Sequence, residues 1–288
     1  MARMRLGVAL LVPDPLAHEI NGLRRACGDG ALDRVPPHLT LVPPVNVSES
    51  RLTEALARLR AAAAVVDGLA LDLGPVTSFL PDSPTLYLAV RGDEGQFDRL
   101  RRVRDAVFQP PLERPLTWPF VPHVTIADDL PPGRLDAAVT ALADYRGHVE
   151  FRGIHLLHER RDEGSATWTP IADYRFGGPL TVGLGSLPLE LTISDVADPE
   201  ARSLLDDTSL DGAGTSHDGS PPSTPGWHPL VVTARRRDEL VGVLTGWSDG
   251  HRSQVGVVVV APAHRGEGIA RHLYARLVAE GGADVVAR

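Results

Sequence analysis

The sequence repeats one motif, first as Pro37-His38-Leu39-Thr40-Leu41 and later as Pro122-His123-Val124-Thr125-Ile126. Each copy places a histidine after a proline, followed by an apolar residue, a threonine and a second apolar residue. One His-x-Thr tripeptide says little, whereas two copies with the same flanking residue types are hard to attribute to chance. Both copies alternate polar and apolar residues, which is typical of a strand with one buried face.

On a strand, side chains two positions apart point to the same face, so each motif presents one imidazole and one hydroxyl together. The apolar residues between them turn to the other face. If the two strands are neighbours, both histidines and both threonines surround one site. These four side chains are His38, Thr40, His123 and Thr125.

Two imidazoles and two hydroxyls suit phosphoryl chemistry. A neutral imidazole takes the proton from an attacking water or hydroxyl, and a protonated imidazole donates to the leaving ribose oxygen. The hydroxyls bond the non-bridging oxygens. Histidine fits both roles because its unperturbed pKa is about 6.5. The residues leave open which of His38 and His123 is the acid and which is the base, and we expect neither a metal nor a cofactor at this site.

Length and composition limit the function classes. A chain of 288 residues is long enough for two separate cores. The formal net charge of -8 argues against a long nucleic-acid track, and all 29 cationic side chains are arginines, which excludes Schiff-base chemistry. Cys27 is the only cysteine, so no intrachain disulfide is expected. No apolar run reaches the ~18 residues of a membrane span. We expect a cytoplasmic protein without membrane contacts.

Strands and helices alternate along the first part of the chain. The segment 176–188 is rich in glycine and indicates a connection, so we predict domains at 1–178 and 188–288 joined by a linker at 179–187. The segment 211–226 is too polar to pack, which indicates a mobile loop inside the second domain. Apolar periodicity predicts strands at 5–12, 39–42, 69–73, 86–90, 121–127, 149–157, 167–174, 230–234, 240–246 and 255–260, and helices at 15–27, 48–66, 94–108, 132–143 and 268–280.

The paired motif and its strand context resemble the two-histidine phosphoesterase superfamily, which includes 2′-5′ RNA ligase-like proteins and cyclic nucleotide phosphodiesterases. The resemblance covers roughly residues 3–176. It implies an α+β fold that is bilobal and pseudo-symmetric, with central antiparallel sheets. It also implies that His38 and His123 are catalytic, that Thr40 and Thr125 bind the substrate phosphate, and that cyclic phosphates are opened, with RNA ligation in some members.

Two other interpretations of the motifs stay open. The histidines could be half-buried strand residues satisfied by nearby backbone, with threonine present for its β propensity. The domain could also bind a nucleotide without cleaving it. Nearby aromatic and cationic residues are weaker candidates, since we prefer a core position for the aromatics and a solvated position for the cations. They are Phe79, Tyr87 and Trp118 for base stacking, and Arg91, Arg152 and Arg175 for phosphate binding.

The tail carries a second signal, a predicted strand at 255–260 followed by Arg265-Gly266-Glu267-Gly268-Ile269-Ala270 at the start of a helix. A glycine-rich turn at a helix N-terminus is a potential anion site, because free N–H groups and the positive end of the helix dipole meet there. It is not a dinucleotide fingerprint, because Arg271 stands where the third glycine is needed. A simple glycine-capped turn is the alternative.

This turn is similar to the cofactor motif of the GNAT acetyltransferases, and the resemblance spans about residues 188–288. It implies a partial α/β domain in which Arg265, Gly266, Gly268, Ile269 and Ala270 bind the pyrophosphate of acetyl-CoA. The family continues with further strands, whereas this sequence stops at 284–288, where the next strand would start. Acetyl transfer, CoA binding alone and a relic domain therefore stay open.

The leading hypothesis is a metal-independent phosphodiesterase that acts on a 2′,3′-cyclic phosphate or a 2′-5′ linkage and is fused to a GNAT-like domain. Its partners would be a small nucleotide or an RNA terminus, and CoA at the second domain. The first alternative is an acetyltransferase that uses acetyl-CoA, with the first domain binding the acceptor. The second alternative is a non-catalytic nucleotide-binding protein.

Overall fold

The structure is a computed structural model, and it describes residues 2–162, 165–184, 187–209, 215–216, 226–281 and 284–286. Two compact units divide the chain, Met1–Pro170 and Ile171–Arg288. The division therefore falls earlier than the boundary at residue 178 expected from the sequence. Part of the expected linker is regular structure, because Leu180–Leu184 forms strand β9.

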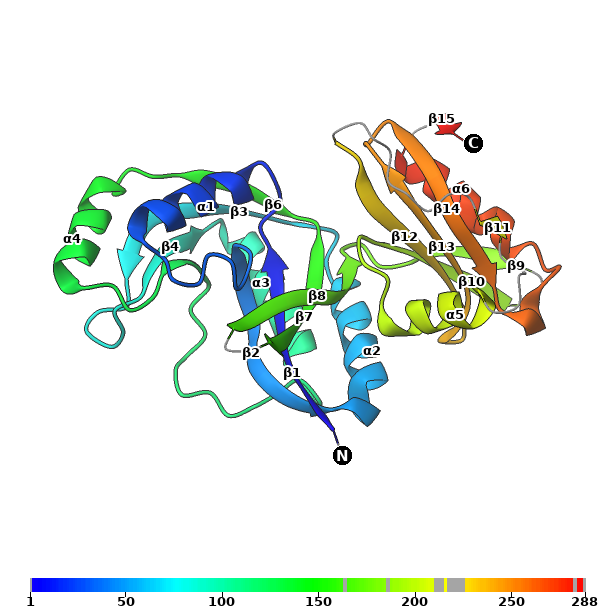
Figure 1. Cartoon of the computed structure of the whole chain (residues 1–288), viewed down its shortest axis with the longest axis horizontal. Coiled ribbons are helices and arrows are strands. Elements are labelled where there is room, and N and C mark those ends of the chain that lie inside the picture. The colour runs from blue at the N-terminus through cyan, green and yellow to red at the C-terminus, as the bar shows by residue number, and fades with distance from the viewer. Residues whose placement is uncertain are drawn as a thin grey trace. The chain divides into compact units, whose positions relative to one another are not determined.

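An eight-stranded sheet organises the first unit, in the order β6-β3-β4-β5-β2-β1-β7-β8. Figure 1 shows this sheet with helices α1–α4. The strand pairs with a defined register are all antiparallel, as expected from the sequence. The strands are β1 (Arg3–Leu11), β2 (His38–Ser48), β3 (Leu69–Ser78), β4 (Leu86–Arg91), β5 (His123–Ala127), β6 (Gly147–Phe151), β7 (Gly153–Asp162) and β8 (Ser165–Arg175).

The first unit is pseudo-symmetric about the junction of β5 and β2. Each motif strand pairs with the strand that precedes it in sequence, β2 with β1 and β5 with β4, and a helix connects each pair. Each connecting helix packs near the motif strand of the other half, and α2 packs beside α3. This arrangement confirms the predicted bilobal fold. The helices are α1 (Leu16–Cys27), α2 (Leu52–Ala63), α3 (Glu94–Val107) and α4 (Pro132–Ala141).

One predicted strand is in fact two. The segment 149–157 divides at Arg152 into β6, which pairs with β3, and β7, which pairs with β1. The chain thus passes from one half of the sheet to the other at this residue. The prediction of a single strand was wrong because apolar residues continue through both strands, so the local pattern carries no sign of the change of partner.

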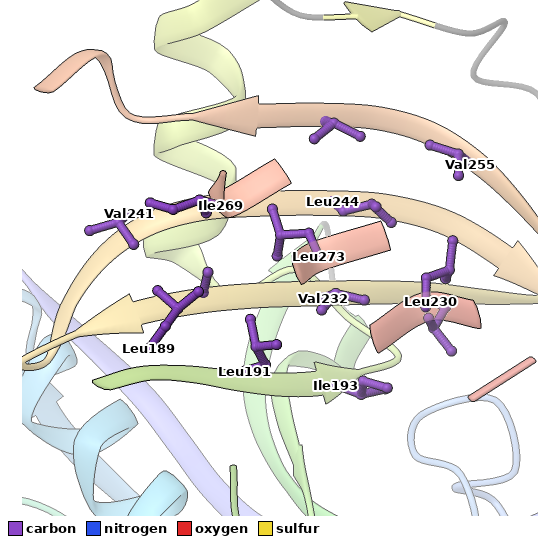
Figure 2. Packing of buried hydrophobic residues seen from close by; sticks show 13 residues of the cluster. Leu189, Leu191, Ile193, Leu230, Val232, Val241, Leu244, Val255, Ile269 and Leu273 are labelled. Atoms are coloured by element: carbon purple, nitrogen blue, oxygen red, sulfur yellow. The ribbon is translucent and has the colours of Figure 1, made fainter. Parts of the chain in front are cut away.

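Two helices cover opposite faces of the sheet in the second unit, whose strand order is β11-β14-β13-β12-β10-β9 with β15 beside β14. α6 (Ile269–Gly281) packs on one face through Leu273 (Figure 2), and α5 (Pro199–Ser209) packs on the other through Ala201. The remaining strands are β10 (Leu187–Ser194), β11 (Thr215–Ser216), β12 (His228–Arg236), β13 (Glu239–Ser248), β14 (Arg252–Val260) and β15 (Asp284–Val286).

The strand expected at the end of the sequence is β15, which runs parallel to β14. The predicted mobile loop at 211–226 lies outside the described residues except for β11 and Gly226. Among the described helices, none has the length and apolar character that a membrane span requires.

Candidate active site

The two histidine motifs meet where the halves of the first sheet join. β2 and β5 are antiparallel neighbours, and Leu39 of the first motif pairs with Val124 of the second. These residues hold the same position in their motifs, so the pairing relates the two copies by a local twofold axis. Both side chains are fully buried, which confirms that the intervening apolar residues turn to the core.

This register brings the four predicted site residues together. His38 falls opposite Thr125, and residues directly opposite in an antiparallel pair point to the same face. Thr40 falls opposite His123 in the same way. All four side chains are half-buried, on the face away from the buried residues between them. One face of two neighbouring strands therefore presents two imidazoles and two hydroxyls.

Both imidazoles are held by the same kind of hydrogen bond. The Nδ1 atom of His38 lies 2.8 Å from the carbonyl oxygen of Pro36, and that of His123 lies 2.7 Å from the carbonyl oxygen of Val121. A carbonyl can only accept, so each Nδ1 carries the proton. Each Nε2 is then left to take or give a proton, which is the atom that acid–base chemistry needs.

The surroundings lower the pKa of both histidines below the ordinary value of 6.5. Burial is the largest cause in each case, because it disfavours the imidazolium. At His38 the positive charge of Arg24 and the neighbouring His123 act in the same direction, while Pro36 and Asp128 oppose it. At His123 the bond to Val121 and the charge of Asp128 oppose the effect of burial. Both imidazoles are therefore mainly neutral at pH 7.

An aromatic pair lies against one of the two histidines. The rings of Phe79 and Tyr87 stack with centroids 4.0 Å apart, and both meet the His123 ring edge-on, at 5.0 Å and 5.4 Å. Tyr87 pairs with Thr125 across the sheet, which places it on the face of the site. Both rings are half-buried. They offer a flat apolar surface next to the imidazole, of the kind on which a nucleobase stacks.

The other half of the site has a different neighbour. Thr40 pairs with Ala9, and Ala9 pairs with His155, so His155 lies on the same face as the threonine. The Trp168 ring lies on this face too, 3.4 Å from the position that a Cβ on Gly7 would take. Trp168 is not among the site residues predicted from the sequence. Its contact joins strands that are far apart in the sequence.

The other aromatic and cationic candidates named from the sequence lie in different environments. Trp118, for which a core position was preferred, is 64% exposed. Arg91 and Arg152 are exposed. Arg175 is the last residue of β8, which crosses the division between the units at residue 170, and it binds Asp195 at 2.8 Å and also Glu280. No group of three or more potential metal ligands occurs within the described part of the chain.

The glycine-rich turn of the second unit leads directly into α6. Gly266 and Gly268 have φ angles of 83° and 81°, which favour glycine. No residue that the structure describes accepts a backbone hydrogen bond from the N–H groups of 266–270, whereas Arg271 N–H donates to Gly268. Glu267 is bound by Arg236 at 2.7 Å. Within the described part of the chain, these N–H groups at the start of α6 therefore have no backbone acceptor.

The fold and the paired motif define a two-histidine phosphoesterase domain in the first unit. Residues 12–163, more than half of the chain, match the family model of the 2′-5′ RNA ligase superfamily. The chain therefore belongs to this superfamily. Residues 201–284 match the acetyltransferase (GNAT) family. Both resemblances inferred from the motifs are thus confirmed.

Similar proteins come from several bacteria. A protein of Geobacillus sp. (strain WCH70), classed by name as a phosphoesterase, is 28% identical over 181 residues, which are 61% of this chain and 98% of that protein. A counterpart from Halalkalibacterium halodurans is 29% identical over 60% of this chain and 98% of its own length. The solved structure of E. coli LigT complexed with 3'-AMP is 19% identical, with a TM-score of 0.45, over 61% of this chain and 99% of that one.

Proposed function

We propose that the first unit is a metal-independent phosphodiesterase that cleaves a 2′,3′-cyclic phosphate or a 2′-5′ linkage in a small nucleotide or at an RNA end. The pairing of Leu39 with Val124 carries the proposal, because it gathers both imidazoles and both hydroxyls on one face. The family name supports phosphoester chemistry, and the two strands supply the groups for it. Cys27 is a free thiol, which suits the cytoplasmic location that we expect.

In the proposed reaction, the Nε2 atom of one neutral histidine removes a proton from a water molecule as its oxygen forms a bond to phosphorus. The bond from phosphorus to the leaving ribose oxygen breaks, and the other histidine, protonated at Nε2, donates its proton to that oxygen. The products are a phosphomonoester and a ribose hydroxyl. The two histidines finish in exchanged protonation states, so proton exchange with solvent restores them.

The threonines act on the phosphate itself. Hydroxyl donors from Thr40 and Thr125 would bond the non-bridging oxygens, whose charge grows as the water attacks. A bound phosphate anion would also raise the lowered pKa of the nearer histidine, since an opposite charge favours the imidazolium. Substrate binding thus helps to create the acid that the reaction needs.

Removal of either imidazole tests this function. We expect His38→Ala and His123→Ala each to lower kcat for a 2′,3′-cyclic mononucleotide by roughly 10²–10⁴-fold, the usual size of an acid–base contribution. His148→Ala is a matched control, because His148 is an exposed histidine of β6. Turnover should persist in EDTA. Unchanged activity in either active-site variant would refute acid–base catalysis by the pair.

The second unit supports a second candidate function, binding of acetyl-CoA and transfer of its acetyl group, with the first unit binding the acceptor. The family match and the free N–H groups of 266–270 favour it. Those groups would bond the pyrophosphate oxygens of the cofactor, and Arg265, which is exposed, lies beside them.

A further inference from the structure

We propose that Arg24 is a positioning residue for His38, a role that rests on the proposed phosphodiesterase function. Arg24 lies in α1, outside both motifs, and only 4% of its side chain is exposed. A charged group is rarely buried to this extent unless its hydrogen bonds are satisfied. Its partners therefore indicate what the residue does.

The Arg24 guanidinium holds the loop that leads into the first motif. Its Nε donates to Asp29 at 2.8 Å, and its two terminal nitrogens donate to the carbonyl oxygens of Val35 and Ala31, both at 2.9 Å. One terminal nitrogen also donates to Asn21 at 3.0 Å. Three of the four bonds thus reach forward into residues 29–35.

The loop passes this constraint directly to the imidazole. The carbonyl of Val35 accepts from Arg24, and the next carbonyl along the chain, that of Pro36, accepts from Nδ1 of His38 at 2.8 Å. Two successive peptide groups therefore connect a buried cation to the atom that orients the imidazole. The α1 end is fixed as well, since Gly28 closes it in the left-handed conformation with φ of 80°.

Stability alone is a poor explanation for the buried pair of Arg24 and Asp29. The cost of removing two charges from water often matches their attraction, so apolar residues of similar size serve a core equally well. The guanidinium does something that an apolar side chain cannot do, because its rigid fork bonds several acceptors in a set geometry. Here those acceptors include the loop carbonyls beside His38.

The imidazole of His123 is held by contacts that do not involve Arg24. His123 can therefore be compared with His38 within the same variant. Its Nδ1 donates to the carbonyl of Val121, a residue that is 43% exposed, and its ring rests against Phe79 and Tyr87. Loss of the Arg24 fork should therefore loosen His38 and leave His123 unchanged.

The variant Arg24→Lys tests the planar donors of the guanidinium separately from its positive charge, because lysine keeps the charge but lacks the planar set of donors. We expect kcat for the cyclic mononucleotide to fall about 10–100-fold with little change in KM, since a small misplacement of a catalytic group has effects of this size. In ¹⁵N spectra of labelled histidines, His38 should lose its Nδ1–H tautomer while His123 retains it. Arg25→Lys, one residue along α1 and exposed, is the matched control.

The double variant Arg24→Met/Asp29→Asn removes both charges. It replaces Arg24→Lys as the test if circular dichroism shows that the lysine variant does not fold. It should show the same loss of kcat and the same change at His38. A folded variant with wild-type kcat and an unchanged His38 tautomer would overturn the positioning role, and so would a wild-type His38 without the Nδ1–H tautomer. If the wild-type protein cleaves neither a 2′,3′-cyclic phosphate nor a 2′-5′ linkage, the proposed phosphodiesterase function is wrong. The comparison of the His38 tautomer in the wild type and the Arg24 variants still tests the positioning role.

Discussion

The two site histidines occupy equivalent positions in a repeated motif but have different neighbours. His38 is near the buried charge of Arg24, whereas His123 contacts the aromatic rings of Phe79 and Tyr87. Burial lowers the pKa of both, so neither is mainly protonated at pH 7 in the free protein. The exposed carboxylate of Asp128 acts on both histidines and favours the protonated form of each.

The lowered pKa values of His38 and His123 predict the pH dependence of the reaction. The pH profile of kcat/KM reports the free enzyme, in which both pKa values are below 6.5, so its maximum should lie on the acidic side of neutrality. The two apparent values belong to the interacting pair rather than to single residues. The pH profile of kcat should lie at higher pH than that of kcat/KM, because the bound phosphate favours the protonated form of the histidines. A kcat/KM maximum above pH 7 would contradict the environment described for the site.

Asp128→Asn tests the electrostatic part of this prediction. Removal of a charge that raises both pKa values lowers both, so the whole kcat/KM profile should move to lower pH and the rate at pH 7 should fall. Asp129→Asn is the control, because Asp129 is the exposed neighbour and its φ of 55° suits asparagine. Equal profiles for the two variants would exclude the role of Asp128.

At the scale of elements, strand pairing places the groups of the first unit, and a turn places those of the second. β2 and β5 bring the motifs together through the pairing of Leu39 with Val124. In the second unit, the turn between β14 and α6 leaves the N–H groups of 266–270 without acceptors among the described residues. Both arrangements present hydrogen-bonding groups suited to an anion.

The turn before α6 predicts acetyl-CoA binding. A ligand at 100 times its Kd stabilises a native protein by about 2.7 kcal/mol, so acetyl-CoA should raise the Tm of the second unit. Gly268→Val should abolish this shift, because a β-branched residue is strained at φ of 81° and would distort the turn. Gly250→Val carries similar strain at φ of 87°, in the connection between β13 and β14, and should keep the shift. No shift in the wild-type protein would remove the CoA-dependent candidate.

At the scale of the whole molecule, the chain combines two compact units with a formal net charge of -8. One hydrophobic cluster of the second unit lies between its sheet and α6 (Figure 2), and a second lies between the sheet and α5. The negative charge repels a long phosphate backbone at distances within the screening length. The proposed substrate is accordingly a small nucleotide or the end of an RNA.

Salt dependence distinguishes this substrate class from a long RNA track. Between about 50 and 200 mM salt, a protein with a basic track loses affinity for RNA steeply, because each counterion released on binding gains less free energy as the salt concentration rises. Here we expect kcat/KM for a long RNA with a terminal 2′,3′-cyclic phosphate to stay constant or rise, and to stay below that of the cyclic mononucleotide. A steep fall of kcat/KM for the long RNA with rising salt would indicate a local basic surface despite the negative net charge.

Much of the fold and the central site was predictable because its signals are local. The alternation of His38, Leu39 and Thr40 indicates a strand and its buried face, and the structure has both. The periodic helices occur near their predicted ranges, and the turn at Gly266 and Gly268 precedes α6 as expected. Such features depend on residues within a few positions of one another, so the sequence alone determines them.

Only the tertiary structure decided which distant segments meet. The change of partner at Arg152, the position of Trp168 over Gly7 and the bonds from Arg24 to the loop before His38 all join elements whose separation in sequence carries no periodic signal. The strand at Leu180–Leu184 likewise depends on pairing with β10 rather than on its glycine-rich surroundings. The physical reason is that strand pairing and buried hydrogen bonds are satisfied by partners anywhere in the chain, whereas propensity and periodicity report only on neighbours.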